Sequence, residues 1–104
     1  YGPSACEYGG DKGIFGYGND ADYTAVTNLV SNTGVVASNV TGVGTARMQL
    51  ASTQYGQDKG IFGYGKPSGS VVSLTNLVSN AGVVATDVTG VGTARQQLAA
   101  CSYN

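Results

Sequence analysis

The sequence predicts an all-β chain built from two tandem repeats, and three observations support that fold class. The segment YGGDKGIFGYG, which starts at Tyr8, returns as YGQDKGIFGYG at Tyr55, 47 positions later. A longer segment that starts at Thr27 returns nearly unchanged at Thr75, 48 positions later. Short runs rich in Val, Ile, Tyr and Phe alternate with Gly, Asn and Ser, a pattern typical of strands separated by turns.

The repeats define one repeat domain that spans residues 1–104. We expect repeat 1 at about 8–54 and repeat 2 at about 55–102. The two units differ mainly in one loop, 19–26 in the first and 66–74 in the second. Self-similarity at a fixed period of this length is typical of repeat architectures.

Four strands are expected in each unit, and the second unit shows them most clearly. Residues 58–65 mix Ile and aromatic residues with glycine, which predicts a strand that ends in a Gly-rich turn. Residues 71–79 and Gly82–Val88 are rich in β-branched residues, which favour strands. Residues 93–103 are ambiguous, because Ala, Arg, Gln and Leu favour helix while the repeat context favours a fourth strand. We predict a strand there.

Four short strands in about 47 residues is the period of a β-propeller blade. The unit also resembles a kelch repeat, in which a first strand begins near an Arg, as at Arg47 and Arg95, and a second strand ends in glycines, as at Ile14–Gly18. The resemblance covers nearly the whole chain. It implies an all-β fold of two four-stranded antiparallel propeller-like blades per chain.

Two blades cannot close a ring, because a propeller has at least four. Stacked repeats also leave apolar faces open at both ends. We therefore expect the fold to be completed by homo-oligomerisation, so that the main partner is the chain itself. Three chains give a six-bladed ring similar to propeller lectins built from two-blade chains. Two or four chains, or an open head-to-tail filament, are the alternatives.

The two cysteines bear on this assembly. Cys6 and Cys101 share one phase of the repeat, with Thr53 between them, and Ala100–Tyr103 begins a third copy. We predict a disulfide between Cys101 of one chain and Cys6 of the next; a bond within one chain or two free thiols are the alternatives. A disulfide and a start at Tyr1 instead of Met fit a trimmed, secreted or extracellular protein. Asn39 begins an Asn-Val-Thr glycosylation sequon.

Composition argues against several classes of function. The formal net charge is -1 with five Lys plus Arg, too few for a nucleic-acid surface, and no apolar run approaches the roughly 18 residues of a membrane span. Without histidine, no Ser-His-Asp or Cys-His arrangement can form. Asp20 and Asp22 are interpreted as a solvated loop, since no calcium-loop spacing is present. We expect no enzyme, no metal and no cofactor.

A duplicated set of polar and aromatic residues is the candidate ligand-binding site. Aromatic rings stack on sugar faces while amides and charged groups bind hydroxyls, so the set predicts a multivalent, lectin-like protein that binds glycans. The alternative is structural: the same residues cap turns and pack between blades of a self-assembling extracellular filament or virion surface protein. The predicted residues are Asp11, Tyr17, Asn28, Arg47, Asp58, Tyr64, Asn76 and Arg95.

Overall fold

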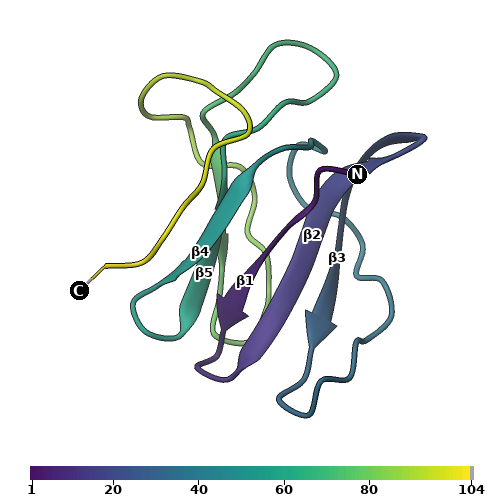
Figure 1. Ribbon diagram of the computed structural model, residues 1–104, viewed down its shortest axis with the longest axis vertical. Helices are drawn as coiled ribbons and strands as arrows, with labels where there is room; N and C mark the ends of the chain where they lie inside the picture. The colour runs from purple at the N-terminus through teal and green to yellow at the C-terminus, as the bar shows by residue number, and fades with distance from the viewer. Residues whose placement is uncertain (104) are drawn as a thin grey trace.

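The computed structural model describes residues 1–103 and is all-β, with strands and loops alternating along the chain (Figure 1). The elements are β1 (Ser4–Tyr8), β2 (Lys12–Asp20), β3 (Asp22–Val30), β4 (Ala51–Tyr55), β5 (Lys59–Gly63) and β6 (Thr75–Val78). They form two antiparallel sheets, with the strand orders β1-β2-β3 and β4-β5-β6. The antiparallel pairing is as the sequence predicted, and each sheet is a meander in which consecutive strands are neighbours.

The two sheets share one register. In the first sheet Cys6 pairs with Ile14, and in the second Thr53 pairs with Ile61. The ladder between β2 and β3 shifts its register between Gly16 and Gly18, which is the mark of a β-bulge. These equivalences show that the sequence repeat is also a structural repeat.

Each sheet has three regular strands where the sequence predicted four. The predicted strand Gly82–Val88 does run along β6, but only two isolated bridges join it, Val78 to Val84 and Thr75 to Val88. Between them the side-chain amide of Asn76 donates to the carbonyl of Ala85 at 3.1 Å. A side chain therefore supplies part of the hydrogen bonding along this edge. Asn28 does the same for the carbonyl of Ala37 in the first unit.

The segment 93–103 forms neither the predicted strand nor the alternative helix. Gln97 has a positive φ of 58°, as does its counterpart Gln49, and a residue in this region ends both regular structures. After Gln49 the chain continues into β4, whereas Ala99–Tyr103 continues as an extended but unpaired segment. We call Ala99–Tyr103 the tail.

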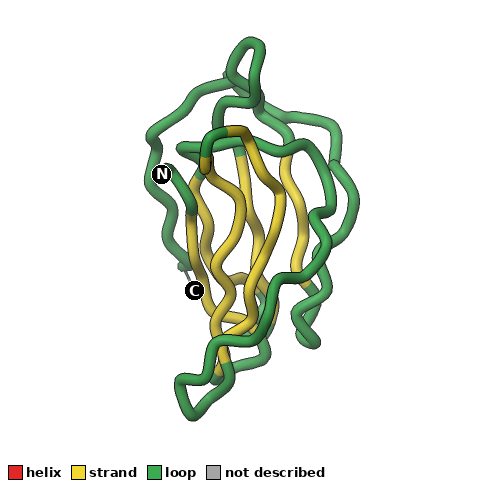
Figure 2. Tube along the Cα trace, turned by 90° about the vertical axis from the view of Figure 1, so that its right-hand side faces the viewer, coloured by secondary structure: helices red, strands yellow, loops and turns green. Residues whose placement is uncertain are grey.

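The first strands of the units lie side by side. Gln49 donates its backbone N–H to the carbonyl of Gly2 at 2.8 Å, and Gln97 donates to the carbonyl of Gln49 at the same distance. The Ser52 hydroxyl also donates to the carbonyl of Ala5. Figure 1 shows the resulting order of β1, β4 and the C-terminal tail, and Figure 2 shows the strands as a layered core wrapped in loops.

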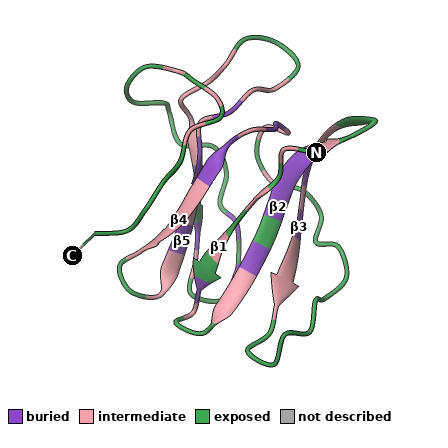
Figure 3. Ribbon diagram, viewed as in Figure 1, coloured by how far each residue is buried: buried purple, intermediate pink, exposed green. Residues whose placement is uncertain are grey.

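The core lies between the two sheets and centres on Phe62. Its side chain is 0% exposed, and its ring lies 5.1 Å from the ring of Tyr17. Gly16 makes room for it, since a Cβ there would lie 3.0 Å from the Phe62 ring. Phe15, the counterpart of Phe62, points away from this core and is 50% exposed. In Figure 3 the buried residues run along the strands while the loops and tail are exposed.

The different surroundings of the two phenylalanines give a test of this packing. Phe62→Ala should lower the free energy of unfolding by about 3–5 kcal/mol, as core Phe truncations do. Phe15→Ala should lower it far less, because half of that side chain is in water already. Urea unfolding of both variants, at dilutions that keep the chain monomeric, measures the difference. Equal losses would show that the two rings contribute alike and contradict the packing.

Candidate functional site

Arg47 lies enclosed between the two sheets. It is 0% exposed, and its guanidinium carbon lies 4.7 Å from the ring centroid of Tyr17, a cation–π distance. Its Nε donates to the carbonyl of Tyr64 at 2.6 Å and its Nη1 to the carbonyl of Thr45 at 2.9 Å. Burial lowers the pKa of Arg47, but an arginine stays protonated at neutral pH. The side chain thus joins the segment that follows the first sheet to the second sheet.

Tyr17, the ring on which Arg47 stacks, is also fixed in place by its contacts. It is 4% exposed, its hydroxyl donates to the carbonyl of Val43 at 2.9 Å, and burial raises its pKa. Its backbone has a φ of 65°, which L-residues seldom adopt. Such a conformation costs about 1–3 kcal/mol and persists only where the surroundings enforce it. Here the hydrogen bond, the Arg47 stack and the Phe62 ring supply that enforcement.

A polar cluster around Asp87 completes the contact between the sheets. Thr45 donates to the Asp87 carboxylate through its backbone N–H at 3.1 Å and its hydroxyl at 2.6 Å. Asn76, itself 0% exposed, donates to the same carboxylate at 2.9 Å. Burial raises the pKa of Asp87, but the hydrogen bonds from Thr45 and Asn76 outweigh it, and the pKa lies below its ordinary value.

The copies of these residues in the other unit lie on open faces. The Arg95 guanidinium stacks on Tyr64 at 4.6 Å, and the Tyr64 hydroxyl donates to the carbonyl of Val91 at 3.0 Å, yet Arg95 is exposed. Asn28 donates to Asn39 at 2.9 Å on the outer face of the first sheet. Each unit therefore forms the same Tyr–Arg stack and the same Asn side-chain bond. Only one copy of each is buried by the neighbouring unit.

Asp11 and Asp58 anchor the turns of the two hairpins. Asp11 accepts from Lys12 at 2.8 Å and from Asn32 at 2.8 Å. Asp58 accepts from Lys59 and from Asn80 in the same way. The lysine hydrogen bond is the main cause that lowers the pKa of each carboxyl. Both clusters lie on the surface, where such ion pairs contribute little to stability.

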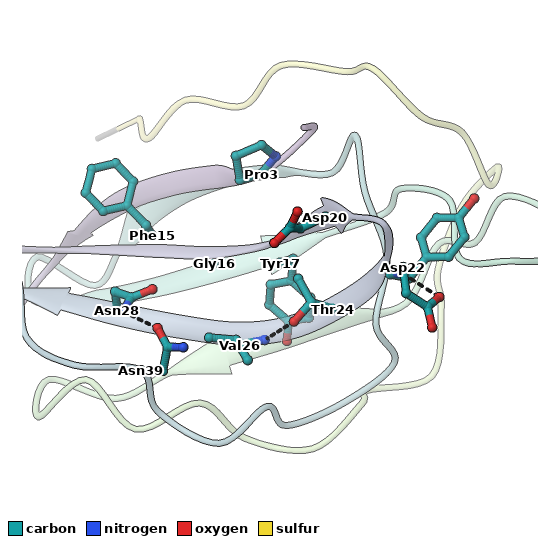
Figure 4. Close-up of a pocket in the computed structure, with 11 residues that line it drawn as sticks. Pro3, Phe15, Gly16, Tyr17, Asp20, Asp22, Thr24, Val26, Asn28 and Asn39 are labelled. Carbon is teal, nitrogen blue, oxygen red and sulfur yellow. Dashed lines mark hydrogen bonds between the residues drawn. The ribbon is translucent and has the colours of Figure 1, made fainter.

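A hollow of the described surface lies on the outer face of the first sheet. It has a volume of about 500 Å³, within the range of small-molecule sites. Figure 4 shows Phe15, Asp20, Asp22 and Asn28 around it, together with Asn39. Tyr23, which is half-buried, adds a second aromatic ring to its wall. An apolar ring beside carboxylates and amides can stack on one face of a ligand and bind hydroxyl groups around it.

The structure thus separates the predicted site residues into four places. Tyr17, Arg47 and Asn76 lie in the packing between the sheets, Tyr64 and Arg95 on the outer face of the second sheet, Asn28 in the hollow, and Asp11 and Asp58 at the hairpin turns. It brings together the stacked pairs Tyr17–Arg47 and Tyr64–Arg95, but the eight predicted residues do not form one site.

Sequence reasoning missed Asp87, Thr45 and Phe62. One signal for Asp87 was present, because it is among the few positions where the repeats differ, with Asn39 as its counterpart. Nothing in the sequence distinguishes Phe62 from Phe15, since both stand in the segment KGIFGYG. Only the packing of one sheet on the other makes the first a core residue.

Cys6 and Cys101 are free thiols, the first half-buried and the second exposed. Burial raises the pKa of Cys6. Within residues 1–103, no three His, Cys, Asp or Glu side chains gather as a metal site would require. The same residues contain no helix of the length and hydropathy that crossing a membrane requires.

Comparison with known proteins adds no family. No protein-family model matches the chain, and no curated protein matches it significantly.

The Asp87 cluster predicts an acid-sensitive contact between the sheets. A carboxyl whose pKa is lowered by folding stabilises the fold above the ordinary aspartate pKa of about 3.9, and this stabilisation is lost as pH falls through the folded-state value. Asp87→Asn should therefore flatten the loss of stability on acidification. Urea unfolding at neutral pH and at about pH 3 measures it, with Asp22→Asn, at the exposed start of β3, as the control. If Asp87→Asn loses as much unfolding free energy between the two pH values as the unsubstituted chain does, the Asp87 cluster does not couple protonation to folding.

Proposed function

We propose that this chain is a non-enzymatic, self-assembling structural module whose two sheets are propeller-like blades completed by identical chains. One observation carries the proposal: Phe62 is fully buried against the first sheet, while Phe15, its counterpart, stands half exposed with no sheet against it. A second copy supplies the missing sheet. The meander order within each sheet and the adjacent first strands support a blade-like arrangement.

The two open faces of the chain are complementary. We call the outer face of the first sheet the leading face; it presents Phe15, Asn28, Val36 and Asn39. These are the counterparts of Phe62, Asn76, Val84 and Asp87, which contact the first unit. Val36 is 55% exposed, whereas Val84 is 9% exposed.

The outer face of the second sheet, which we call the trailing face, presents Ile61, Gly63, Tyr64 and Thr75. Their counterparts Ile14, Gly16, Tyr17 and Thr27 form the surface on which Phe62 packs. A Cβ on Gly63 would meet only Thr75, because the ring that fills this space beside Gly16 is missing. The trailing face therefore has a vacant place for Phe15 of another chain. Because the faces differ, the contact is head-to-tail and leads to a ring or a filament.

The contact between chains lacks one charge that the internal contact has. Inside the chain Thr45 donates to Asp87, but the corresponding Thr93 of one chain meets Asn39 of the next. A neutral amide replaces a carboxylate, and charge-assisted hydrogen bonds are the stronger ones. We expect the contact between chains to be weaker than the one between sheets, which favours assembly that depends on concentration.

Under this proposal, glycosylation of Asn39 and assembly through the leading face exclude each other. Asn39 lies on the leading face, so a glycan on its side chain stands where the next chain packs. A chain glycosylated at Asn39 is therefore expected to stay unassembled at that face.

The order of the first strands bears on the predicted disulfide between Cys6 and Cys101, because β4 lies between β1 and the tail within one chain. This order favours a disulfide between chains over one inside a chain.

A second candidate function is carbohydrate binding in a secreted protein, and the hollow of the leading face favours it. Phe15 and Tyr23 supply rings, and Asp20, Asp22 and Asn28 supply polar groups around about 500 Å³. Binding there competes with assembly, since Phe15 serves both. The two functions therefore predict opposite effects of a sugar on the size of the protein.

Self-assembly can be tested with variants of the two faces. Phe15→Ala and Gly63→Val should each raise the concentration at which oligomers form, since burying a Phe contributes about 1.5–3 kcal/mol, roughly 10- to 150-fold in affinity. Sedimentation velocity over a dilution series measures this. Val35→Ala is the matched control, because its counterpart Val83 stays 66% exposed beside the first sheet. A chain that remains monomeric at high concentration would refute the proposal.

Carbohydrate binding can be tested on a glycan array with the native chain. Tyr23→Ala should abolish any signal, because it removes a ring from the hollow that the second unit does not duplicate. Ser68→Ala is the control, since it lies exposed in the corresponding loop of the second unit and does not line the hollow. Binding that survives Tyr23→Ala places the site elsewhere, and a blank array removes this candidate.

A further inference from the structure

The tail is a third copy of β1. Its sequence, AACSY, matches SACEY of Ser4–Tyr8 at the Ala, Cys and Tyr positions. It matches ASTQY of β4 (Ala51–Tyr55) only at the first Ala and the last Tyr. The tail therefore resembles the strand that begins the first sheet more closely than the strand that begins the second.

The tail already lies where a third first strand belongs. Gln97 donates to the carbonyl of Gln49 at 2.8 Å, just as Gln49 donates to the carbonyl of Gly2. A shallow hollow lined by Thr53–Gly56 and Cys101–Tyr103 marks the contact between β4 and the tail. Among residues 1–103, however, no backbone hydrogen bond joins Ala99–Tyr103 to another segment. The tail is thus placed as a strand but has no partner strand.

The place of β1 in the first sheet makes specific demands. Cys6 points toward the second sheet, where its sulfur lies 2.9 Å from the position that a Cβ on Gly60 would take. Tyr8 is 4% exposed, and its ring lies 3.0 Å from the position that a Cβ on Gly82 would take. The tail carries the same two residue types at these inward positions, Cys101 and Tyr103. In β4 the first of these positions is Thr53.

We propose that the tail is a donor strand: Ala99–Tyr103 of one chain pairs with β2 of a second copy and replaces that copy's own β1. The proposal deepens the proposed self-assembly and rests on it. The β1–β2 register fixes the pairing, with Cys101 opposite Ile14 and Tyr103 opposite Lys12 of the second copy. Strand addition of this kind obtains affinity from main-chain hydrogen bonds and specificity from alternate side chains.

The arrangement has a physical advantage over simple packing of the two faces. A second copy that docks on the trailing face brings its β1 to the place that the tail occupies, so one of the two segments must leave. Gln97, two residues before the tail, is bonded to Gln49 and so orients the tail, which lowers the ordering cost of binding. The exchange also gives the assembly a direction, from the tail of one chain to β2 of the next.

A disulfide-trapping experiment tests the exchange in the full chain. Lys12→Cys and Tyr103→Cys are combined, with Cys6→Ser and Cys101→Ser to remove the native thiols. Serine keeps the size of cysteine and avoids Thr, the residue that β4 carries at this position. Mild oxidation should convert the monomer band into dimers and higher species on a non-reducing gel, with the two introduced cysteines joined between chains. The matched control replaces Lys12→Cys with Lys59→Cys, whose partner Tyr55 lies in the same hairpin.

The outcomes separate the two proposals. Cross-linking of the Lys12→Cys variant without cross-linking of the control supports the exchange. Oligomers in sedimentation velocity with no cross-link overturn the exchange and leave face-to-face assembly intact, with the tail as the displaced segment. Equal cross-linking of both variants also overturns it, because the tail then pairs without selecting β2. A chain that stays monomeric overturns both proposals.

Discussion

The insertion of Phe62 into the space beside Gly16 is the contact on which the rest of the structure depends. Neither sheet has a core of its own: each is three short strands with one apolar face. The ring fills the gap that the absent Gly16 side chain leaves and packs on Tyr17. Tyr17 in turn supports Arg47, and so aligns the segment that leads into the second sheet. Loss of this one ring would weaken the contact between the sheets that encloses the arginine.

The same sequence is used twice in different surroundings, and this asymmetry is what gives the molecule a function. Each unit forms the Tyr–Arg stack, the Asn amide bond and the hairpin anchor on its own. The neighbouring sheet then decides whether these groups are interior or surface. A contact that is satisfied once inside the chain and left open at both ends is a template for the next chain. That is the physical basis for assembly as the proposed function, ahead of ligand binding.

The hollow of the leading face and the assembly of the chain draw on the same residues. Phe15 lines the hollow and is also the ring that the trailing face lacks. A ligand bound there and a neighbouring chain exclude each other, so binding and assembly are linked by mass action. The second unit has Asp87 where the first has Asn39. Under the proposed assembly, this difference makes the contact between chains weaker than the contact between the sheets.

The sequence alone determined the all-β class, the two units and their antiparallel sheets. Runs of β-branched residues and Gly-rich turns are local signals, and the repeat contains them twice. The sequence also excluded histidine-based chemistry. It did not determine the strand number, because side chains of Asn28 and Asn76 take over hydrogen bonds that a strand would make. It did not separate Phe62 from Phe15, or Arg47 from Arg95, because identical segments carry identical local information. Only the packing of the second sheet on the first decides which copy is buried, since burial is a property of neighbours and not of the residue.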